Sequence, residues 1–302
     1  MRRRGDNAEM AGDDSRTQVQ LDQETLARRR RVLGEDHPDT LAAASDLAVS
    51  LRAVGGHPGT VTSASNLASS VLHRGKHQAA RELGEDTLAR RRRVLGEDHP
   101  DTLATANGLV ISLRVVGEHQ AARELAEDTL ARRRRVLGED HPDTLTSADN
   151  LAFSLQGQPQ AARELAEDTL ARRRRVLGED HPDTLVSASN LVMILGRVGE
   201  DQAARELAED ILARRRRVLG EDHPDTLNAA FQLVGALMAL GEYHAARELN
   251  DDIIARRRRV LGDDHPETMM AGSFDLILRG LDLGGEPEWM TALREAHKKP
   301  GS

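Results

Sequence analysis

The apolar residues of this chain recur three and four positions apart, which is the spacing of one face of an α-helix. In residues 143–156 they are Leu145, Ala148, Leu151, Ala152 and Leu155, and in residues 159–176 they are Ala162, Leu165, Ala166, Leu170 and Val176. A proline opens the first stretch and Gly178 follows the second, where helices favour these residues. No stretch alternates with a period of two, so the pattern predicts helices and no strands.

The two predicted helices form a repeated unit. The sequence QAARELAEDTLARRRRVLGEDHPDTL of residues 120–145 is identical at 160–185 and differs at one position in 78–103 and in 202–227. Its His–Pro dipeptide recurs every 42 residues, apart from one interval of 40 and one of 62 residues, and the longer interval contains a second marker, His57, so one unit is cut to 20 residues. Because one helix pair cannot bury its own apolar stripe, we expect the pairs to stack on their neighbours.

The repeats predict three parts. Residues 1–16 are polar and expected to be disordered, residues 17–282 form a solenoid with one truncated unit near 37–56, and residues 283–302 hold a capping helix, anchored by Trp289, and a tail. In the truncated unit, a short linker joins helices expected at 39–53 and 60–73. Such a connection permits only antiparallel neighbours. We therefore expect helix 39–53 to take the place of a second helix and helix 18–32 that of a first helix.

One unit carries a specific signature. It begins with Asn150–Leu151–Ala152, continues through Gly157, Ala162, Leu165 and Leu170, and closes with VLGEDHPD at 176–183. This sequence resembles the 42-residue tetratricopeptide repeat of kinesin light chains, a type with many bacterial members, and the resemblance covers about residues 17–282. It implies an all-α fold, a right-handed α-solenoid of stacked antiparallel helix pairs whose first helices line a concave groove.

The chain departs from that family at its large residues. Leu113 and Leu155 replace large aromatics of the first helix, and Ala126 and Ala166 replace those of the second. Arg132 and its equivalents occupy a position that is usually apolar, so we expect their aliphatic stems to cover a thin core.

Composition narrows the chemistry. The chain has 302 residues, a net charge of −8, five aromatic residues and no cysteine. The lack of cysteine excludes disulfides, thiolate catalysis and Cys-ligated metals, and a core of Leu, Ala and Val is expected. No apolar run is long enough for a membrane helix, and the basic N-terminus lacks the apolar stretch of a signal peptide. We therefore expect a cytoplasmic protein without a membrane partner.

Each unit contains four consecutive arginines. These quartets are residues 28–31, 90–93, 132–135, 172–175, 214–217 and 256–259. They could form a basic ladder for nucleic acid, but residues 120–159 hold five Arg and seven acidic residues, and consecutive helical residues point 100° apart. The pattern favours local pairing with acids and with the negative helix terminus. No nucleic-acid partner is expected, and the basic ladder remains the minor alternative.

No motif supports catalysis. The His–Pro–Asp tripeptide also occurs in J-domain co-chaperones, but here it lies in the loop between units without the helices of that domain. One histidine per unit, without HExxH spacing, does not predict a metal site. Nucleophile-elbow and phosphate-loop motifs are absent from the sequence. The chain is therefore expected to be non-enzymatic and to use no cofactor and no metal.

The first helices differ from unit to unit, whereas the second helices are near copies. By the resemblance, the varied positions face the groove. Asn and Gln can bond an extended peptide backbone, and Phe and Met can form side-chain pockets. The candidate partner-binding residues are Asn66, Asn107, Arg114, Asp149, Asn150, Phe153, Ser189, Asn190, Met193, Arg197, Asn228, Phe231 and Gln232.

These observations predict a scaffold that holds a protein or peptide partner in the concave groove. Two alternatives stay open. The varied positions could reflect drift on a solvent-exposed face. The chain could also be the sensor arm of a STAND/NB-ARC-type signalling NTPase whose nucleotide domain is absent from this chain, because its first repeat begins with a helix of the second type at 21–32.

Overall fold

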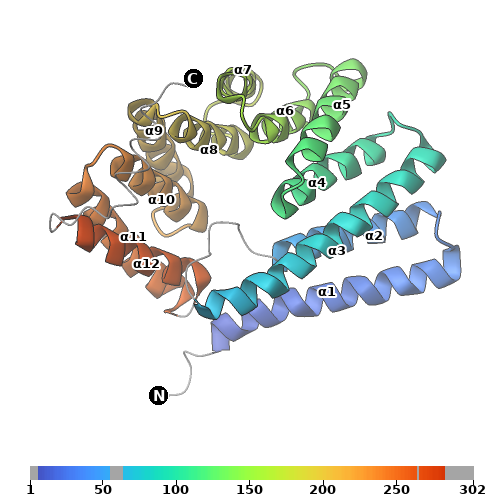
Figure 1. Ribbon diagram of the computed structural model, residues 1–302, viewed down its shortest axis with the longest axis horizontal. Helices are drawn as coiled ribbons and strands as arrows, with labels where there is room; N and C mark the ends of the chain where they lie inside the picture. The colour runs from blue at the N-terminus through green and yellow to red at the C-terminus, as the bar shows by residue number, and fades with distance from the viewer. Residues whose placement is uncertain (1–5, 55–63, 264, 283–302) are drawn as a thin grey trace. The chain divides into compact units, whose positions relative to one another are not determined.

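The computed structural model describes residues 6–54, 64–263 and 265–282, with side-chain contacts for 17–51 and from residue 76 on, apart from a few positions near the end (Figure 1). This part of the chain forms twelve α-helices and no strand, which confirms the all-α prediction. The helices are α1 (Asp6–Leu33), α2 (Pro38–Val54), α3 (Ala64–Leu95), α4 (Pro100–Val116), α5 (His119–Leu137), α6 (Pro142–Ser154), α7 (Pro159–Leu177), α8 (Pro182–Arg197), α9 (Asp201–Leu219), α10 (Pro224–Ala239), α11 (Tyr243–Leu261) and α12 (Pro266–Asp282).

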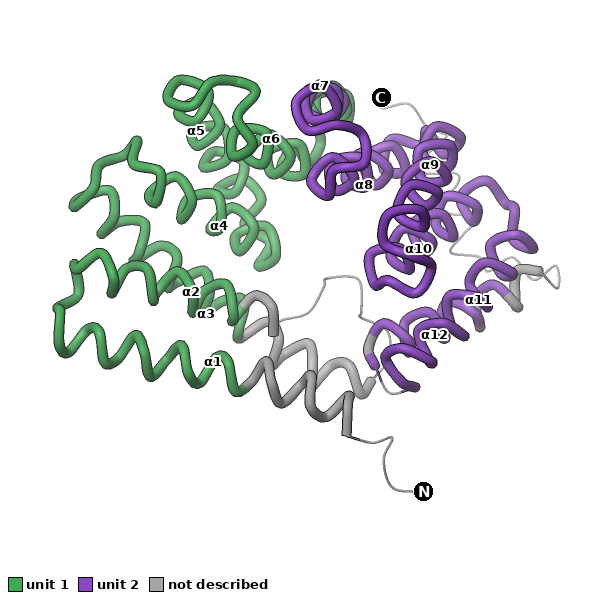
Figure 2. The backbone as a smooth tube through the Cα atoms, turned by 180° about the vertical axis from the view of Figure 1, so that it is seen from behind, with its two compact units in different colours: residues 1–165 green, residues 166–302 purple. Residues whose placement is uncertain are grey.

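The chain divides into two units, residues 1–165 and 166–302, with the boundary inside α7 (Figure 2). In unit 1 each helix from α1 to α6 packs on the next, and α4 also contacts α2 and α6. In unit 2 each helix from α8 to α12 packs on the next, and α8 contacts α10. The even-numbered helices, here called first helices, therefore form one layer in each unit, and the odd-numbered second helices form the other. Each unit is an α-solenoid of antiparallel pairs.

The His–Pro–Asp tripeptide starts the first helices. His141 has extended backbone torsions, φ −66° and ψ 138°, and its Nδ1 accepts a hydrogen bond from the backbone N–H of Asp143 at 3.1 Å. Pro142 then occupies the first helical position, where its missing N–H has no partner to lose. His99, His181 and His223 cap α4, α8 and α10 in the same way. The tripeptide is thus a helix cap.

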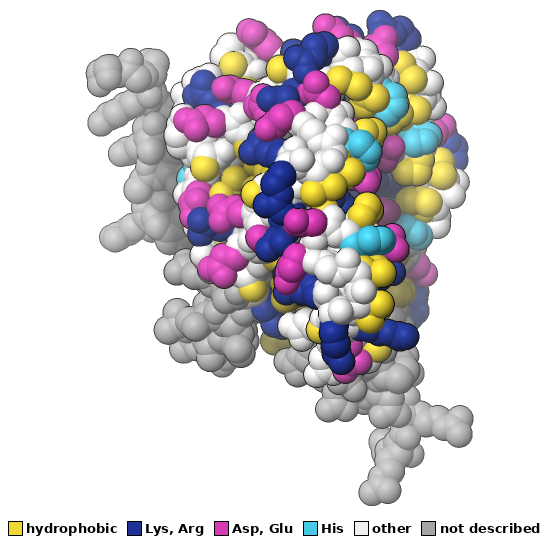
Figure 3. Space-filling view, turned by 90° about the vertical axis from the view of Figure 1, so that its right-hand side faces the viewer, with side chains coloured by type: hydrophobic (Ala, Val, Ile, Leu, Met, Phe, Trp, Pro, Cys, Tyr) yellow, Lys and Arg dark blue, Asp and Glu magenta, His cyan; other side chains and the backbone are white. Residues whose placement is uncertain are grey.

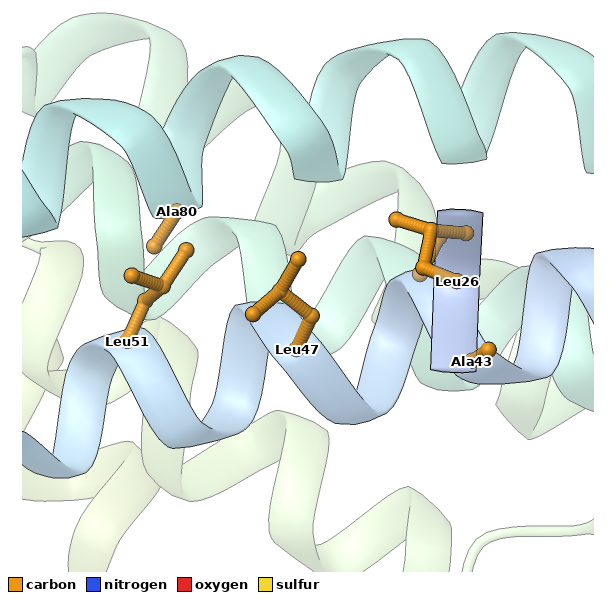
Figure 4. Close-up of a cluster of buried hydrophobic side chains, with 6 residues drawn as sticks. Leu26, Ala43, Leu47, Leu51 and Ala80 are labelled. Carbon is orange, nitrogen blue, oxygen red and sulfur yellow. The ribbon is translucent and has the colours of Figure 1, made fainter. Parts of the chain in front are cut away.

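The core is thin and aliphatic. Leu26 of α1, Leu47 and Leu51 of α2, and Ala80 of α3 are each at most 7% exposed and meet in one cluster (Figure 4). Buried apolar residues elsewhere are also mostly Leu and Ala, and no described aromatic side chain is fully buried. The expected core of small aliphatic residues is confirmed.

The expected inversion of the first helix pair is wrong. Arg29 Nη1 donates to the carbonyl oxygen of Asp39 at 2.8 Å, the same bond that Arg133 makes to Asp143 at 2.7 Å. α1 therefore joins α2 as every second helix joins the following first helix. The segment expected as a separate helix at 60–73 has no break from the next helix, because α3 runs for 32 residues. α3 as a whole lies in the layer of second helices, so α2 belongs to the layer of first helices.

The predicted termini differ as well. α1 begins at Asp6, so residues 6–16 belong to a helix and not to the disordered tail that their polarity suggested. Residues 1–5 and the capping helix expected around Trp289 lie outside the described residues.

Candidate functional site

Each second helix holds the following first helix through the second arginine of its quartet. This residue is buried in five of the six quartets: Arg91 is 6% exposed, Arg133 4%, Arg173 3%, Arg215 7% and Arg257 0%, whereas Arg29 of α1 is half-buried. Arg133 Nη1 donates to the carbonyl oxygen of Asp143 at 2.7 Å and to Ser147 Oγ at 2.9 Å. Burial lowers the pKa of this guanidinium, because the charged form loses hydration. The bond fixes where the first helix starts.

The expectation that the aliphatic stem of Arg132 covers the core is wrong. Its side chain is 26% exposed and lies among acids instead of covering the core. Arg132 Nε bonds Asp128 one turn earlier at 2.9 Å, and Nη1 bonds Asp98, in the loop before α4, at 3.2 Å. Arg135 Nη2 bonds the same Asp98 at 2.6 Å. The first and fourth arginines of this quartet therefore tie α5 to the loop that precedes its own first helix, α4.

The same clamp recurs in unit 2. Arg214 and Arg217 bond Asp180, and Arg256 and Arg259 bond Asp222. A hydrogen bond from Arg214 and, to a smaller extent, one from Arg217 lower the pKa of Asp180. Figure 3 shows one face of the molecule, on which basic and acidic side chains interleave. These arginines pair with acids inside the array, so a basic ladder does not form from them.

In unit 1, the candidate surface contains a polar chain across α5, α6 and α4. Ser147 Oγ, which accepts from Arg133, donates to Asn107 Oδ1 at 3.2 Å, and Asn150 Nδ2 donates to the same oxygen at 2.9 Å. Asn107 and Asn150 are both half-buried. Within the described residues, no hydrogen bond engages Asn107 Nδ2 or Asn150 Oδ1. One amide N–H₂ and one carbonyl oxygen thus remain for a ligand.

An aromatic contact lies on the same two helices. The Arg114 guanidinium carbon is 4.9 Å from the centroid of the Phe153 ring, a cation–π distance. Both side chains are half-buried, so they add an apolar and cationic area to the surface. Asp149 does not belong to it. Its side chain faces inward and is only 5% exposed, which corrects its predicted role.

In unit 2, α8 presents a different surface. Met193 is 48% exposed and Val186 is 47% exposed, and the two lie two helical turns apart on one face. Asn190 lies between them and is half-buried, and Arg197 is exposed one turn further. Ser189 is 7% exposed and is therefore no contact residue, contrary to the prediction. This face is more apolar than that of α4 and α6.

Two of the three candidates on α10, Asn228 and Phe231, contact a buried arginine. Asn228 Oδ1 accepts from Arg257 Nη2 at 2.8 Å, and the Arg257 guanidinium carbon is 5.5 Å from the Phe231 ring centroid. Phe231 also packs edge-on against Phe274 of α12, with centroids 4.9 Å apart and planes at 78°. Asn228 and Phe231 thus surround a buried charge. Gln232, which follows Phe231 in the sequence, is half-buried.

The remaining expectations concern residues or sites outside these surfaces. The side chain of Asn66 lies outside the described residues. Hollows of about 520 and 350 Å³ lie along α1 and are lined by none of the candidate residues. Among the described residues, no group of three His, Asp or Glu side chains could hold a metal ion. No helix in the described part is long and apolar enough to cross a bilayer.

The buried arginine was missed, although the sequence signals it. Ala122, Ala126 and Thr129 are buried and spaced four and three residues apart, and the next step of that helical stripe is Arg133. Extending the stripe by one turn would have identified Arg133, and not Arg132, as the inward-facing residue.

Comparison with known proteins agrees with this architecture. Family models described as tetratricopeptide repeat match residues 59–134 and residues 19–39, 144–183, 184–225 and 226–267. No curated protein matches the chain.

Several solved structures are similar. A Podosopora anserina protein described as a kinesin light chain with nearly identical TPR-like repeats is 29% identical over 74% of this chain and 98% of its own, with a TM-score of 0.57. A single-substitution variant of that protein is 31% identical over 68% of this chain and 98% of its own, with a TM-score of 0.54. BtubC from P. vanneervenii is 18% identical over 82% of this chain and 92% of its own, with a TM-score of 0.59, and shares the fold.

NprR, solved with its cognate peptide NprX, also shares the fold, at 14% identity over 95% of this chain and 77% of its own, with a TM-score of 0.51. The repeat signature, the stacked helix pairs and the matching family models agree, and the chain belongs to the tetratricopeptide repeat family, with kinesin-light-chain-like repeats.

Proposed function

We propose that the chain is a non-catalytic scaffold that binds an extended segment of a protein partner along its first helices. Tetratricopeptide repeats generally act as protein-interaction scaffolds, and a protein of the same fold, NprR, is known with its cognate peptide. The proposal locates binding in unit 1 on α4 and α6, and in unit 2 on α8.

The observation that carries the proposal is the Asn107–Asn150 pair. Each side chain is held by the other, so neither has to lose much rotamer entropy when a ligand binds. The remaining N–H₂ and carbonyl groups can donate to and accept from one peptide unit. Arg114 and Phe153 lie on the same helices and offer a flat apolar contact with a positive charge. The arrangement suits an extended segment that carries an apolar residue and a carboxylate.

A peptide-display selection tests this surface. Random peptides are selected on the full chain, and the affinity of the selected peptides is then measured by calorimetry for Asn150→Ala with Phe153→Ala. We expect a loss of about tenfold or more, since losing one or two hydrogen bonds and an aromatic contact exceeds about 1.4 kcal/mol. Circular dichroism checks that the variant is folded.

The matched control changes two exposed residues of second helices, Glu127→Ala with Glu167→Ala, and should leave affinity unchanged. If the selected peptides lose affinity for the control and bind the α6 variant like the wild type, the partner site lies on the second helices and the proposal is wrong.

A further inference from the structure

Among the second helices, α1 comes earliest in the chain, and one of its faces is exposed where the other second helices bury theirs. Thr25 is exposed, whereas its equivalents Thr87, Thr129 and Thr169 are each 1% exposed. Val32 is 70% exposed, against 44–50% for the equivalent valines of the later repeats. A hollow of about 350 Å³ follows this face and is lined by Thr25, Arg28, Arg29, Val32 and Leu33. For α3, α5, α9 and α11, a preceding first helix packs on the second helix.

Two arginines of α1 lack the acidic partner that their equivalents have in other described repeats. Arg28 and Arg31 are the equivalents of Arg132 and Arg135, which clamp Asp98 ahead of α4. Within the part of the chain that the structure describes, no carboxylate pairs with Arg28 or Arg31. Two guanidinium groups therefore flank the exposed face of α1 without the acid that every other fully described clamp contains.

α12, the last helix that the structure describes, also has an exposed face. α12 is a first helix, because Arg257 Nη1 donates to the carbonyl oxygen of Glu267 at 2.9 Å as the other buried arginines do. Met269 is 60% exposed, whereas its equivalents Leu41, Leu103, Leu145, Leu185 and Leu227 are 2–4% exposed. In the sequence, Asp264 precedes His265 as Asp222 precedes His223, so the position that supplies the clamp acid is aspartate here too. Asp264 itself lies outside the described residues.

We propose that copies of this chain associate head to tail, with α12 of one copy packing on the exposed face of α1 of the next. The two helices would then form a pair of the kind that α4 and α5 form. Arg28 and Arg31 would meet the acidic loop ahead of α12, and Met269 would be covered by a second helix. Such a contact joins two different surfaces, so it extends into a filament unless its rotation closes a ring. The inference concerns the ends of the array and is independent of the proposed peptide surface.

Sedimentation velocity over a concentration series tests the proposal on the full chain. The head variant is Arg28→Glu with Arg31→Glu, and the tail variant is Met269→Glu. The control is Arg134→Glu with Arg216→Glu, which makes the same charge change at exposed positions inside the array. We expect the wild type and the control to exceed twice the monomer mass as concentration rises. The head and tail variants should each stay monomeric.

Mixing the two variants gives the decisive result. The head variant keeps an intact α12 and the tail variant keeps an intact α1, so one contact can form and a second cannot. We expect a species of two chains and nothing larger. A symmetric contact between two α1 faces predicts no complementation, and that outcome overturns the proposal.

A wild type that remains monomeric throughout also overturns it. The role that the proposal gives to Arg28 and Arg31 further requires association to weaken as salt rises, because salt screens exposed ion pairs.

Discussion

The second and first helices of this protein differ in how much their sequences vary, and the contacts explain the difference. α5 and α7 share the sequence QAARELAEDTLARRRRVL, whereas α6 and α8 share the opening Pro–Asp–Thr–Leu and only a few later positions. This helix holds the buried arginine and the two clamp arginines, and the equally uniform loop after each second helix supplies the aspartate that the next clamp binds. A change at any of these positions disturbs a junction between helices, so uniform residues assemble the array and varied residues distinguish its surfaces.

The largest effect is expected at the buried arginine of the uniform helix. Arg133→Gln removes charge-assisted bonds to Asp143 O and Ser147 Oγ. It should lower the free energy of unfolding by about 2–3 kcal/mol, since buried acceptors are left unpaired. Arg132→Gln should cost about 0.5–1 kcal/mol, because its ion pairs are partly solvated. Arg134→Gln, at an exposed position, should cost less. Urea denaturation followed by circular dichroism measures the order, and three equal losses would show that the quartet acts as a uniform charged surface.

A smaller effect should separate two asparagines of the varied helices. Asn228→Ala removes the acceptor for Arg257 Nη2. It should cost about 1–2 kcal/mol, since it leaves a buried donor without that partner. Asn190→Ala, at a half-buried position on α8, should cost under about 0.5 kcal/mol. The same denaturation experiment compares them. Equal losses would mean that α8 and α10 use these asparagines alike.

The histidine cap should contribute less again. His141→Ala removes the acceptor for Asp143 N–H. It should lower stability by about 1 kcal/mol, whereas His141→Asn keeps a capping acceptor and should recover most of it. His244→Ala is the control, because its side chain is 70% exposed. Thermal melts monitored by circular dichroism give the ranking. A loss in His141→Asn as large as in His141→Ala would show that the imidazole packs instead of capping.

The smallest effect is a change in pH dependence. Arg214 and Arg217 lower the pKa of Asp180 in the folded state below its ordinary value of 3.8. The unfolded chain therefore binds the proton more tightly, and the stability from this clamp is present above about pH 4 and lost as pH falls below it. Asp180→Asn should reduce the drop in melting temperature between about pH 5 and about pH 2.5. An unchanged drop would assign acid sensitivity to other carboxylates.

Sequence periodicity was sufficient for most of the helices and for the proline and glycine at their ends, because these depend on residues close along the chain. The histidine cap was not predicted, although it too depends on neighbouring residues. His141, Pro142 and Gly138 have the same local role wherever the unit occurs. Three predictions failed for a common reason. The burial of Asp149 and Ser189, the inward position of Arg133 and the layer of α2 depend on which neighbours a helix meets. For α2 the deciding feature was the continuous α3, which no local pattern between 60 and 77 indicated.

Part of the candidate surface could be predicted and part could not. The positions of Asn107 and Asn150 on one layer follow from the repeat register. Their mutual hydrogen bond depends on the contact between α4 and α6, which the register does not specify. Asn228 and Phe231 were grouped with them because all varied positions of the first helices were expected to face the groove. In the structure both side chains instead contact the buried Arg257.

The 32-residue helix α3 has a consequence for how such an array changes in length. A shortened unit did not disturb the Arg29–Asp39 and Arg91–Asp101 junctions on either side of it, at 2.8 and 2.9 Å. Each junction is therefore specified by its own short segment, and a deletion between junctions only merges two helices into one. Recombination between near-identical coding repeats can then add or remove whole units without creating a junction that has to be selected anew.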